Sequence, residues 1–262
     1  MNATIAAQMT GADILKLRKK RGILTWSLVV ALAPILIYFV VAVIQHASSP
    51  ANHGPAGGVQ NFSDGLRVIA LLFGPLAALL IGVEAGTGDA SAGVFRDLVV
   101  TGRSRLALFA SRVPAALAVT FAMMIGAYVL LLIGTFAFAA NLPTPSVSLI
   151  FNGLGFTLLS TGILCVVGVG FASLTASKPA AIIAVIAWHI VASPILASIK
   201  SLGSSREVLL SQALAHFSPV HVGEGGHGAT VVLSTGTAVI VLLAWAAVFL
   251  ALGAWRTRTM DA

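Results

Sequence analysis

The sequence predicts an all-α polytopic membrane protein with six transmembrane helices. Of its 262 residues, 58% are hydrophobic and only 9% are charged, and the mean hydropathy is +1.01. An ordinary soluble domain carries about a quarter charged residues. The apolar residues also form continuous runs, and a run of about 20 residues is what a helix needs to cross the hydrocarbon core. We therefore expect residues 1–262 to form a single transmembrane domain.

Six apolar runs are long enough to span a bilayer, at about residues 23–44, 66–83, 112–138, 149–172, 179–198 and 229–255. Backbone groups find no water in lipid, so such runs indicate helices, whereas barrel strands would alternate over about ten residues. The single cysteine, Cys165, lies in the fourth run and excludes a disulfide framework. The first run is longer than the apolar region of a signal peptide, so we expect it to remain as a span.

The distribution of lysine and arginine predicts the orientation, because basic residues accumulate in cytoplasmic connections. With the N-terminus in the cytoplasm, only Arg67, Lys200 and Arg206 of the 15 basic residues fall outside. An even number of spans then returns the C-terminus to the cytoplasm. The net charge of +7 is accounted for by this topology. We therefore expect the lipid bilayer, and no nucleic acid, as a partner.

Residues 10–21 are predicted to form an amphipathic helix on the inner membrane surface. Ile14, Leu15 and Leu17 are interleaved with basic residues, and anionic lipids attract each basic residue by about 1 kcal/mol. The alternative is a solvated charged tail that only enforces topology. The residues expected to anchor this helix to the membrane surface are Lys16, Arg18, Lys19, Lys20 and Arg21.

Two external connections differ in character. Residues 46–65 are rich in Ser, Pro, Asn, His and Gly, which is typical of a flexible loop. Residues 199–228 are long for a structureless connection and contain an apolar helical pattern from Val208 to Phe217. This helix is too short to cross the membrane. We expect a re-entrant segment that dips into the outer leaflet or lies on it, as a candidate lid over a pathway.

The cytoplasmic segment 84–111 concentrates charges of both signs between two apolar spans. Gly86 and Gly88 permit a change of direction, and a short helix at about 85–97 would present Phe95 as an apolar contact. Lipid gives no reason to place acidic residues here, whereas a soluble protein partner does. The alternative is a basic loop that only sets topology. The charged residues are Glu84, Asp89, Arg96, Asp97, Arg103 and Arg105, with Arg112 close behind.

This segment resembles the type-2 permeases of ATP-binding-cassette (ABC) transporters, the ABC-2-like exporters. In that family the segment that joins the second and third spans contains, in order, Glu, a Gly-containing turn, Arg and Leu, and it ends with a motif similar to Thr-Pro-x-Ser-Arg. The sequence differs at Gly102, where the family usually has Pro, at Arg112, where Lys is common, and at Gly93-Val94, which replaces Gly-Thr. The corresponding residues here are Glu84, Gly93, Arg96, Leu98, Thr101, Ser104 and Arg105.

The resemblance implies a permease subunit of an exporter in a bacterial inner membrane, with an amphipathic cargo such as a drug, peptide or lipid. Its coupling helix would dock to a separate ABC ATPase that holds ATP and Mg, and a second permease copy or a sister permease would complete the pathway. This chain, which has no P-loop motif, would hold no cofactor. The expected ATPase contacts are Glu84, Asp89, Phe95, Arg96 and Asp97, and Arg103, Arg105 and Arg112 would anchor the loop at lipid headgroups.

The remaining polar residues indicate no catalytic or metal site. His189 and Asn152, both in predicted spans, are expected to bridge neighbouring helices or to line the pathway, with bridging favoured. The external histidines His216, His221 and His227 match no recognised metal spacing. No span centre carries a carboxylate, which disfavours an ion-coupled carrier or channel acting without an ATPase. That carrier is the alternative function, and a membrane-embedded enzyme or scaffold is a further one.

Overall fold

The computed structural model describes residues 3–93, 95–100, 102, 104–220, 231 and 233–259, with only the backbone at residues 95 and 96. It is 86% helical, and its described residues form no strand. Six helical segments of the described chain are long and apolar enough to cross a membrane. The predicted all-α, multi-pass architecture is thereby confirmed. These segments are Arg21–Ser48, Gly58–Ser91, Arg105–Ala137, Val147–Thr175, Lys178–Ser198 and Thr235–Thr259.

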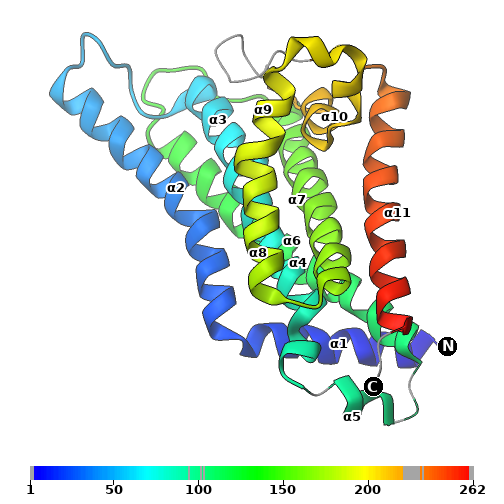
Figure 1. Ribbon diagram of the computed structural model, residues 1–262. Coiled ribbons are helices and arrows are strands. Elements are labelled where there is room, and N and C mark those ends of the chain that lie inside the picture. Colours follow the sequence, from blue (N-terminus) through cyan, green and yellow to red (C-terminus); the bar gives the residue numbers. More distant parts are fainter. Residues whose placement is uncertain are drawn as a thin grey trace.

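The helices follow one another with short connections, and two spans each contain a π-helical turn (Figure 1). The second span comprises α3 (Gly58–Arg67), the turn η1 (Val68–Phe73) and α4 (Gly74–Ser91), and the fifth comprises α8 (Lys178–Ile186), η2 (Ala187–Ala192) and α9 (Ser193–Ser198). The other elements are α1 (Ala3–Lys19), α2 (Arg21–Ser48), α5 (Phe95–Val100), α6 (Arg105–Ala137), α7 (Val147–Thr175), η3 (Lys200–Val208), α10 (Leu210–His216) and α11 (Thr235–Thr259).

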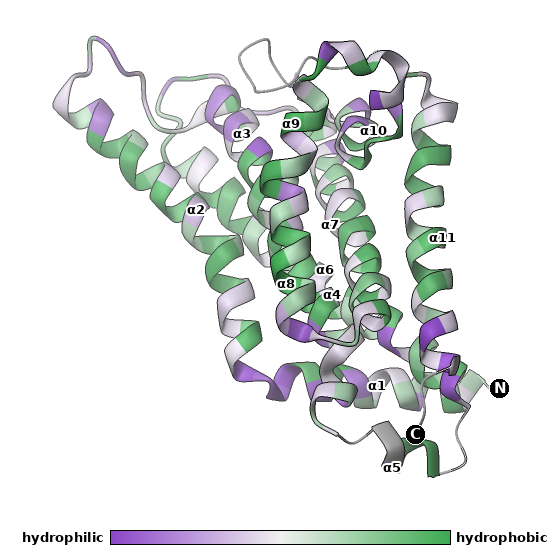
Figure 2. Cartoon of the chain, viewed as in Figure 1, coloured by the Kyte–Doolittle hydropathy of each residue, from purple (hydrophilic) through white to green (hydrophobic). Residues whose placement is uncertain are grey.

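The spans form a bundle in which α4 and α7 are the most buried helices and α2, α8 and α11 lie at the periphery. Helix α1 lies across one end of the bundle (Figure 1). Helix α5 and the last turn of α11 lie at the same end, and we call this end of the bundle the basic end. Segments η3 and α10 lie at the opposite end. Figure 2 shows apolar residues along the spans and polar residues gathered at the two ends. This distribution fits a bundle that crosses a hydrocarbon layer.

Glycines bring the central helices α4 and α7 into close contact. A Cβ atom at Gly86 would lie 2.6 Å from the carbonyl oxygen of Val169 and 2.8 Å from the Cβ of Ala172. Gly82 faces the backbone of α7 in the same way, one turn earlier. Lipid tails are as apolar as the side chains, so small residues that permit such close packing stabilise helix association in membranes.

Several predicted boundaries are wrong, and one is the start of the third span, which begins at Arg105 rather than at about residue 112. Helix α1 begins at Ala3 rather than residue 10, so Asp13 lies inside the helix. The second span begins at Gly58, because Phe62 and Leu66 are buried and hold residues of the predicted 46–65 loop in a helix. The same span continues past Glu84 to Ser91, because the glycines expected to turn the chain are contact residues against α7.

The connection between the fifth and sixth spans is helical but divided. The predicted single helix is interrupted by Leu209, whose extended backbone separates the 3-10 helix η3 from α10. Helix α10 buries Leu210, Ala213 and Leu214 and packs against α11. Residues 221–228 of the predicted re-entrant segment lie outside the described residues, and these include His221 and His227.

Adding a methyl group at Gly86 tests the α4–α7 contact. We expect Gly86→Ala to destabilise the protein by about 1–3 kcal/mol, because the α7 backbone must move to admit it. Gly126 in α6 has no atom within 4 Å of a built Cβ, so Gly126→Ala is the matched control. Alanine favours a helix by up to about 1 kcal/mol, so this control should be neutral or stabilising. Thermal unfolding in detergent measures both, and equal effects would contradict the packing described.

Candidate functional site

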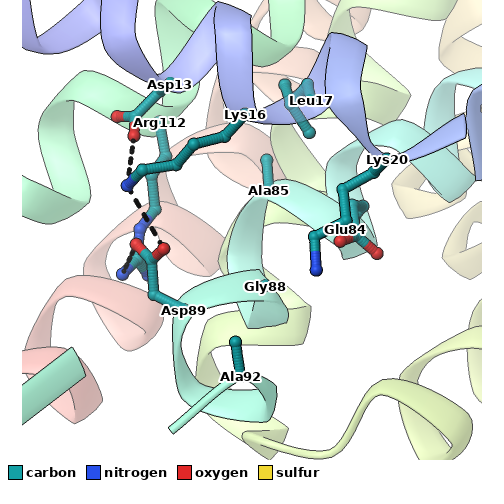
Figure 3. A pocket seen from close by; sticks show the side chains of 10 residues that line it. All are labelled: Asp13, Lys16, Leu17, Lys20, Glu84, Ala85, Gly88, Asp89, Ala92 and Arg112. Atoms are coloured by element: carbon teal, nitrogen blue, oxygen red, sulfur yellow. Dashed lines mark hydrogen bonds and ion pairs between the residues drawn. The ribbon is translucent and has the colours of Figure 1, made fainter. Parts of the chain in front are cut away.

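Charged side chains from four separate helices meet at the basic end of the bundle, and Figure 3 shows those of α1, α4 and α6. They come from the surface helix α1, the second span, the third span and the start of the fifth span. Isolated charges away from water are costly, so such groups are found paired. We call this set the charge cluster, and its members are Asp13, Lys16, Glu84, Asp89, Arg112 and Lys178.

Asp89 is the centre of the charge cluster. Its Oδ2 lies 3.0 Å from Nη2 of Arg112 in α6, and its Oδ1 lies 3.2 Å from Nζ of Lys16 in α1. Arg112 also donates a hydrogen bond of 3.2 Å from Nη1 to the carbonyl oxygen of Gly86. Asp89 and Arg112 are 9% and 5% exposed, respectively. One carboxylate therefore ties three helices together in a site that excludes most water.

Asp13 attaches the surface helix α1 to the bundle. Its Oδ1 lies 3.0 Å from Nζ of Lys16, and its Oδ2 accepts a hydrogen bond of 2.7 Å from Oγ of Ser111 in α6. Burial alone would lower the pKa of Lys16, but its hydrogen bond to Asp13 and the charges of Asp89 and Asp13 raise the pKa above 10.5. Lys16 thus stays charged near neutral pH, and its contribution to stability is lost only as the pH rises above 10.5.

Glu84 links α4 to the start of the fifth span. Its side chain is 2% exposed, and Oε2 lies 2.5 Å from Nζ of Lys178 in the first turn of α8. The sequence pattern indicates Lys178 only as one of the cytoplasmic basic residues and gives Asp13 no role in a site. One signal could have found both residues. The predicted topology places Lys178 and Asp13 on the same side of the membrane as Glu84 and Asp89, where charges of opposite sign can pair.

A cavity of about 250 Å³ lies within the cluster, between α1, α4 and α6 (Figure 3). Three carboxylates and three cationic groups line it, so its formal charge is balanced and favours neither an anion nor a cation. Among the described residues, no group of three or more His, Cys, Asp or Glu is placed to hold a metal. The cluster thus connects helices. Its lining is Asp13, Lys16, Leu17, Lys20, Glu84, Ala85, Gly88, Asp89, Ala92 and Arg112.

The structure corrects the predicted positions of three site residues. Glu84 and Asp89 were expected to face a partner protein, but both are buried in α4 and pair within the chain. Arg112 was expected to reach lipid headgroups, but it is buried against Asp89. Two misplaced boundaries explain these differences. The second span continues past Glu84 to Ser91, which places Glu84 and Asp89 inside a helix. The third span begins at Arg105 rather than at about residue 112, which places Arg112 inside α6.

The part of segment 84–111 that projects from the bundle is shorter than predicted and lies later in the sequence. Gly93 has a φ of +70°, which suits the turn that follows α4. Helix α5 (Phe95–Val100) then extends beyond the basic end (Figure 1). Asp97 is exposed, and Val100 is 80% exposed. The expected helix at 85–97 is therefore corrected to 95–100.

The other predicted partner and anchor residues are distributed around this end. Phe95 and Arg96 lie in α5, with side chains outside the described part, and Arg103 lies outside it altogether. Arg105 is partly buried and donates a hydrogen bond of 3.2 Å to the carbonyl oxygen of Arg258. The remaining anchor candidates are exposed, namely Arg18, Lys19, Lys20 and Arg21.

The two polar residues of the spans differ in position. The side chain of Asn152 is exposed and donates to Ser148 of its own helix at 3.4 Å, so the predicted bridge to a neighbouring helix is wrong within this chain. His189 lies in the π-helical turn η2, with its ring against the backbone of Leu71 and Leu72 in η1. It thus lies between the second and fifth spans.

Comparison of the sequence with protein-family models and with curated proteins gives no match in either case. The resemblance to ABC-2-like permeases accordingly depends on the residues of the 84–105 segment and on the topology.

Breaking the Asp89–Arg112 pair tests the role of the charge cluster in stability. We expect Arg112→Met to cost about 3 kcal/mol, because it leaves the buried Asp89 carboxylate with only Lys16. Lys16→Met is the matched control: the Lys16 side chain is 43% exposed, and such pairs contribute less than about 1 kcal/mol. Thermal unfolding of both variants in detergent gives the comparison. A loss for Arg112→Met no larger than for Lys16→Met would show that the cluster does not stabilise the bundle.

Proposed function

We propose that this chain is the permease subunit of an ABC exporter in a bacterial inner membrane. Helix α5 docks to a separate ATPase that carries ATP and Mg, and a second permease copy or a sister permease completes the pathway. The cargo is amphipathic, such as a drug, peptide or lipid. The observation that carries this proposal is the position of α5, a short exposed helix between the second and third spans at the basic end.

Docking requires an exposed surface, and α5 offers one. The apolar side chain of Val100 is exposed, and its exposure to water is unfavourable. Asp97 adds a charge on the same short helix. Interfaces commonly combine an apolar anchor with a polar rim. In this proposal Phe95 and Val100 are apolar contacts with the ATPase, and Arg96 and Asp97 form charge pairs at the rim.

The charge cluster supplies a path for force from α5 to the spans. The chain enters α5 from α4 and leaves it into α6, and these two helices are tied by the Asp89–Arg112 pair. Lys16 and Lys178 extend the ties to α1 and α8. Movement of a docked α5 by the closing ATPases therefore moves several helices as a unit. The pathway between two permease copies opens or closes in response.

The docking proposal predicts that a charge at Val100 weakens binding to the ATPase. We expect Val100→Asp to reduce co-purification of the ATPase at least about tenfold, because a buried apolar anchor contributes about 2 kcal/mol or more. Leu202→Asp is the matched control, since Leu202 is an exposed leucine of η3 at the opposite end. The chain is isolated from host membranes in mild detergent, and its stoichiometric partners are identified.

Two results would contradict the docking proposal. One is recovery of the folded chain without any ABC ATPase across several detergents. The other is retention of the ATPase by Val100→Asp at the level of Leu202→Asp, which would place the interface elsewhere than on α5.

A second candidate function, an ion-coupled carrier, is favoured by one observation. The Glu84 carboxylate is buried in a helix long and apolar enough to span a membrane, and ionisable groups in such helices often carry ions or protons. Its pairing with Lys178 near the basic end argues for a structural role instead. Transport that requires a proton gradient, proceeds without an ATPase and is abolished by Glu84→Gln would establish the carrier.

A further inference from the structure

A second cavity, of about 230 Å³, lies about halfway along the spans and is separate from the charge cluster. Residues of helices α4, α7, α8, α10 and α11 and of the turn η2 line it. The proposed coupling mechanism does not use it. The lining residues are Leu79, Leu164, Val167, Phe171, Ala184, Val185, Trp188, Leu210, Trp245 and Phe249.

A continuous row of aromatic rings runs along this cavity. The ring centroids of Trp188 and Trp245 are 5.7 Å apart, Trp245 stacks on Phe249 at 5.6 Å, and Phe249 meets Phe171 edge-on at 5.9 Å. The row connects the fifth span, the sixth span and α7. Such rings provide a large apolar surface with a fixed shape.

The described lining contains no ionisable side chain. The indole N–H of Trp245 already donates a hydrogen bond of 2.9 Å to the carbonyl oxygen of Val208, so it is satisfied. The indole N–H of Trp188 is the other side-chain donor of the lining, and it is uncharged. A charged ligand group would lose its hydration here without meeting an opposite charge, which is costly. The cavity therefore suits a hydrocarbon group.

The rim of the cavity faces the surface that contacts lipid. Two lining residues on the fifth span, Ala184 of α8 and Trp188 of η2, are exposed. The neighbouring surface is aliphatic, with Ile183 69% exposed on α8 and Ile240 67% exposed on α11. In a spanning bundle, the medium against such a surface is the acyl chains of the bilayer.

We propose that this cavity binds one acyl chain of a bilayer phospholipid. The chain enters sideways between α8 and α11, and its headgroup stays at the membrane surface, where it remains hydrated. The volume is below the roughly 300–1,000 Å³ of pockets that enclose a drug-sized ligand, which suits one chain rather than a whole lipid. A bound acyl chain contacts apolar residues of α8, α10 and α11 at once and so links these three helices. This inference is independent of the proposed ATPase partnership.

Fluorescence quenching by a phospholipid with brominated acyl chains tests the site directly. Trp26 and Trp255 are replaced by Phe, which leaves Trp188 and Trp245 of the four tryptophans as reporters. The detergent-purified chain, without any ATPase, is titrated with the brominated phospholipid. We expect saturable quenching with about one lipid bound per chain, reversed by an excess of the unbrominated phospholipid.

Filling the mouth of the cavity provides the matched variants. Ala184→Phe places a ring at the opening, and we expect about tenfold weaker binding, equivalent to about 1.4 kcal/mol. Ala180→Phe, one turn away on α8 and outside the lining, should bind as the parent does.

Three outcomes would overturn the site. They are quenching that rises linearly without saturation, failure of the unbrominated lipid to compete, and equal binding by the two Phe variants. A chain that elutes as a dimer and shows no quenching would assign this face to a second copy and also overturn it. The competition measurement is made on the chain with Ala184 in place, so it tests acyl-chain binding even if the Ala184→Phe variant fails to fold.

Discussion

The buried ion pair between Asp89 and Arg112 is the interaction on which the arrangement of the basic end depends. The loss of either charge would weaken the site, because a buried ion that loses its main partner costs several kcal/mol. Their pairing fixes the separation of α4 and α6, and Lys16 and Asp13 use the same site to hold α1 across the end of the bundle. The Glu84–Lys178 pair extends the constraint to α8. Buried pairs of this kind specify an arrangement of helices more than they add stability.

The two cavities divide the bundle between two kinds of solvent. At the basic end, a charge-balanced cavity adjoins helices that face water and lipid headgroups. Midway along the spans, an aromatic cavity faces hydrocarbon and offers no charge among its described lining. The α4–α7 contact runs between them, and its glycines hold the backbones close enough to act as one rigid core. In the proposed mechanism, a displacement at α5 would reach the spans through the charge cluster. Helices α8 and α11 both contribute residues to the aromatic cavity.

Hydropathy alone predicts six helices that are long and apolar enough to span a membrane, because a helix that crosses lipid must be largely apolar, but it misplaces both ends of the second span. A helix is also present where mixed basic and apolar residues predict one, although it begins at Ala3 rather than residue 10, and its location on the membrane surface stays a prediction. The charge cluster could not be predicted, since Lys16 and Asp89 are 73 residues apart and only the fold brings them together. Glu84 was misplaced for a local reason: glycine and charge together usually end a span, whereas here the glycines pack against α7 and the charges are paired. The cluster thus involves the residues for which local sequence signals were misleading.

The central claim is that the charge cluster makes α5 and the spans move as one unit. Spin labels at residue 100 of α5 and residue 183 of α8, both at exposed positions, measure this by the distance distribution between them. The account predicts one narrow distribution that persists when ATPase and ATP are added, and a broad distribution once Arg112 is replaced by Met. A distance in the unaltered chain that changes with ATP, or a distribution insensitive to the loss of Arg112, would contradict it.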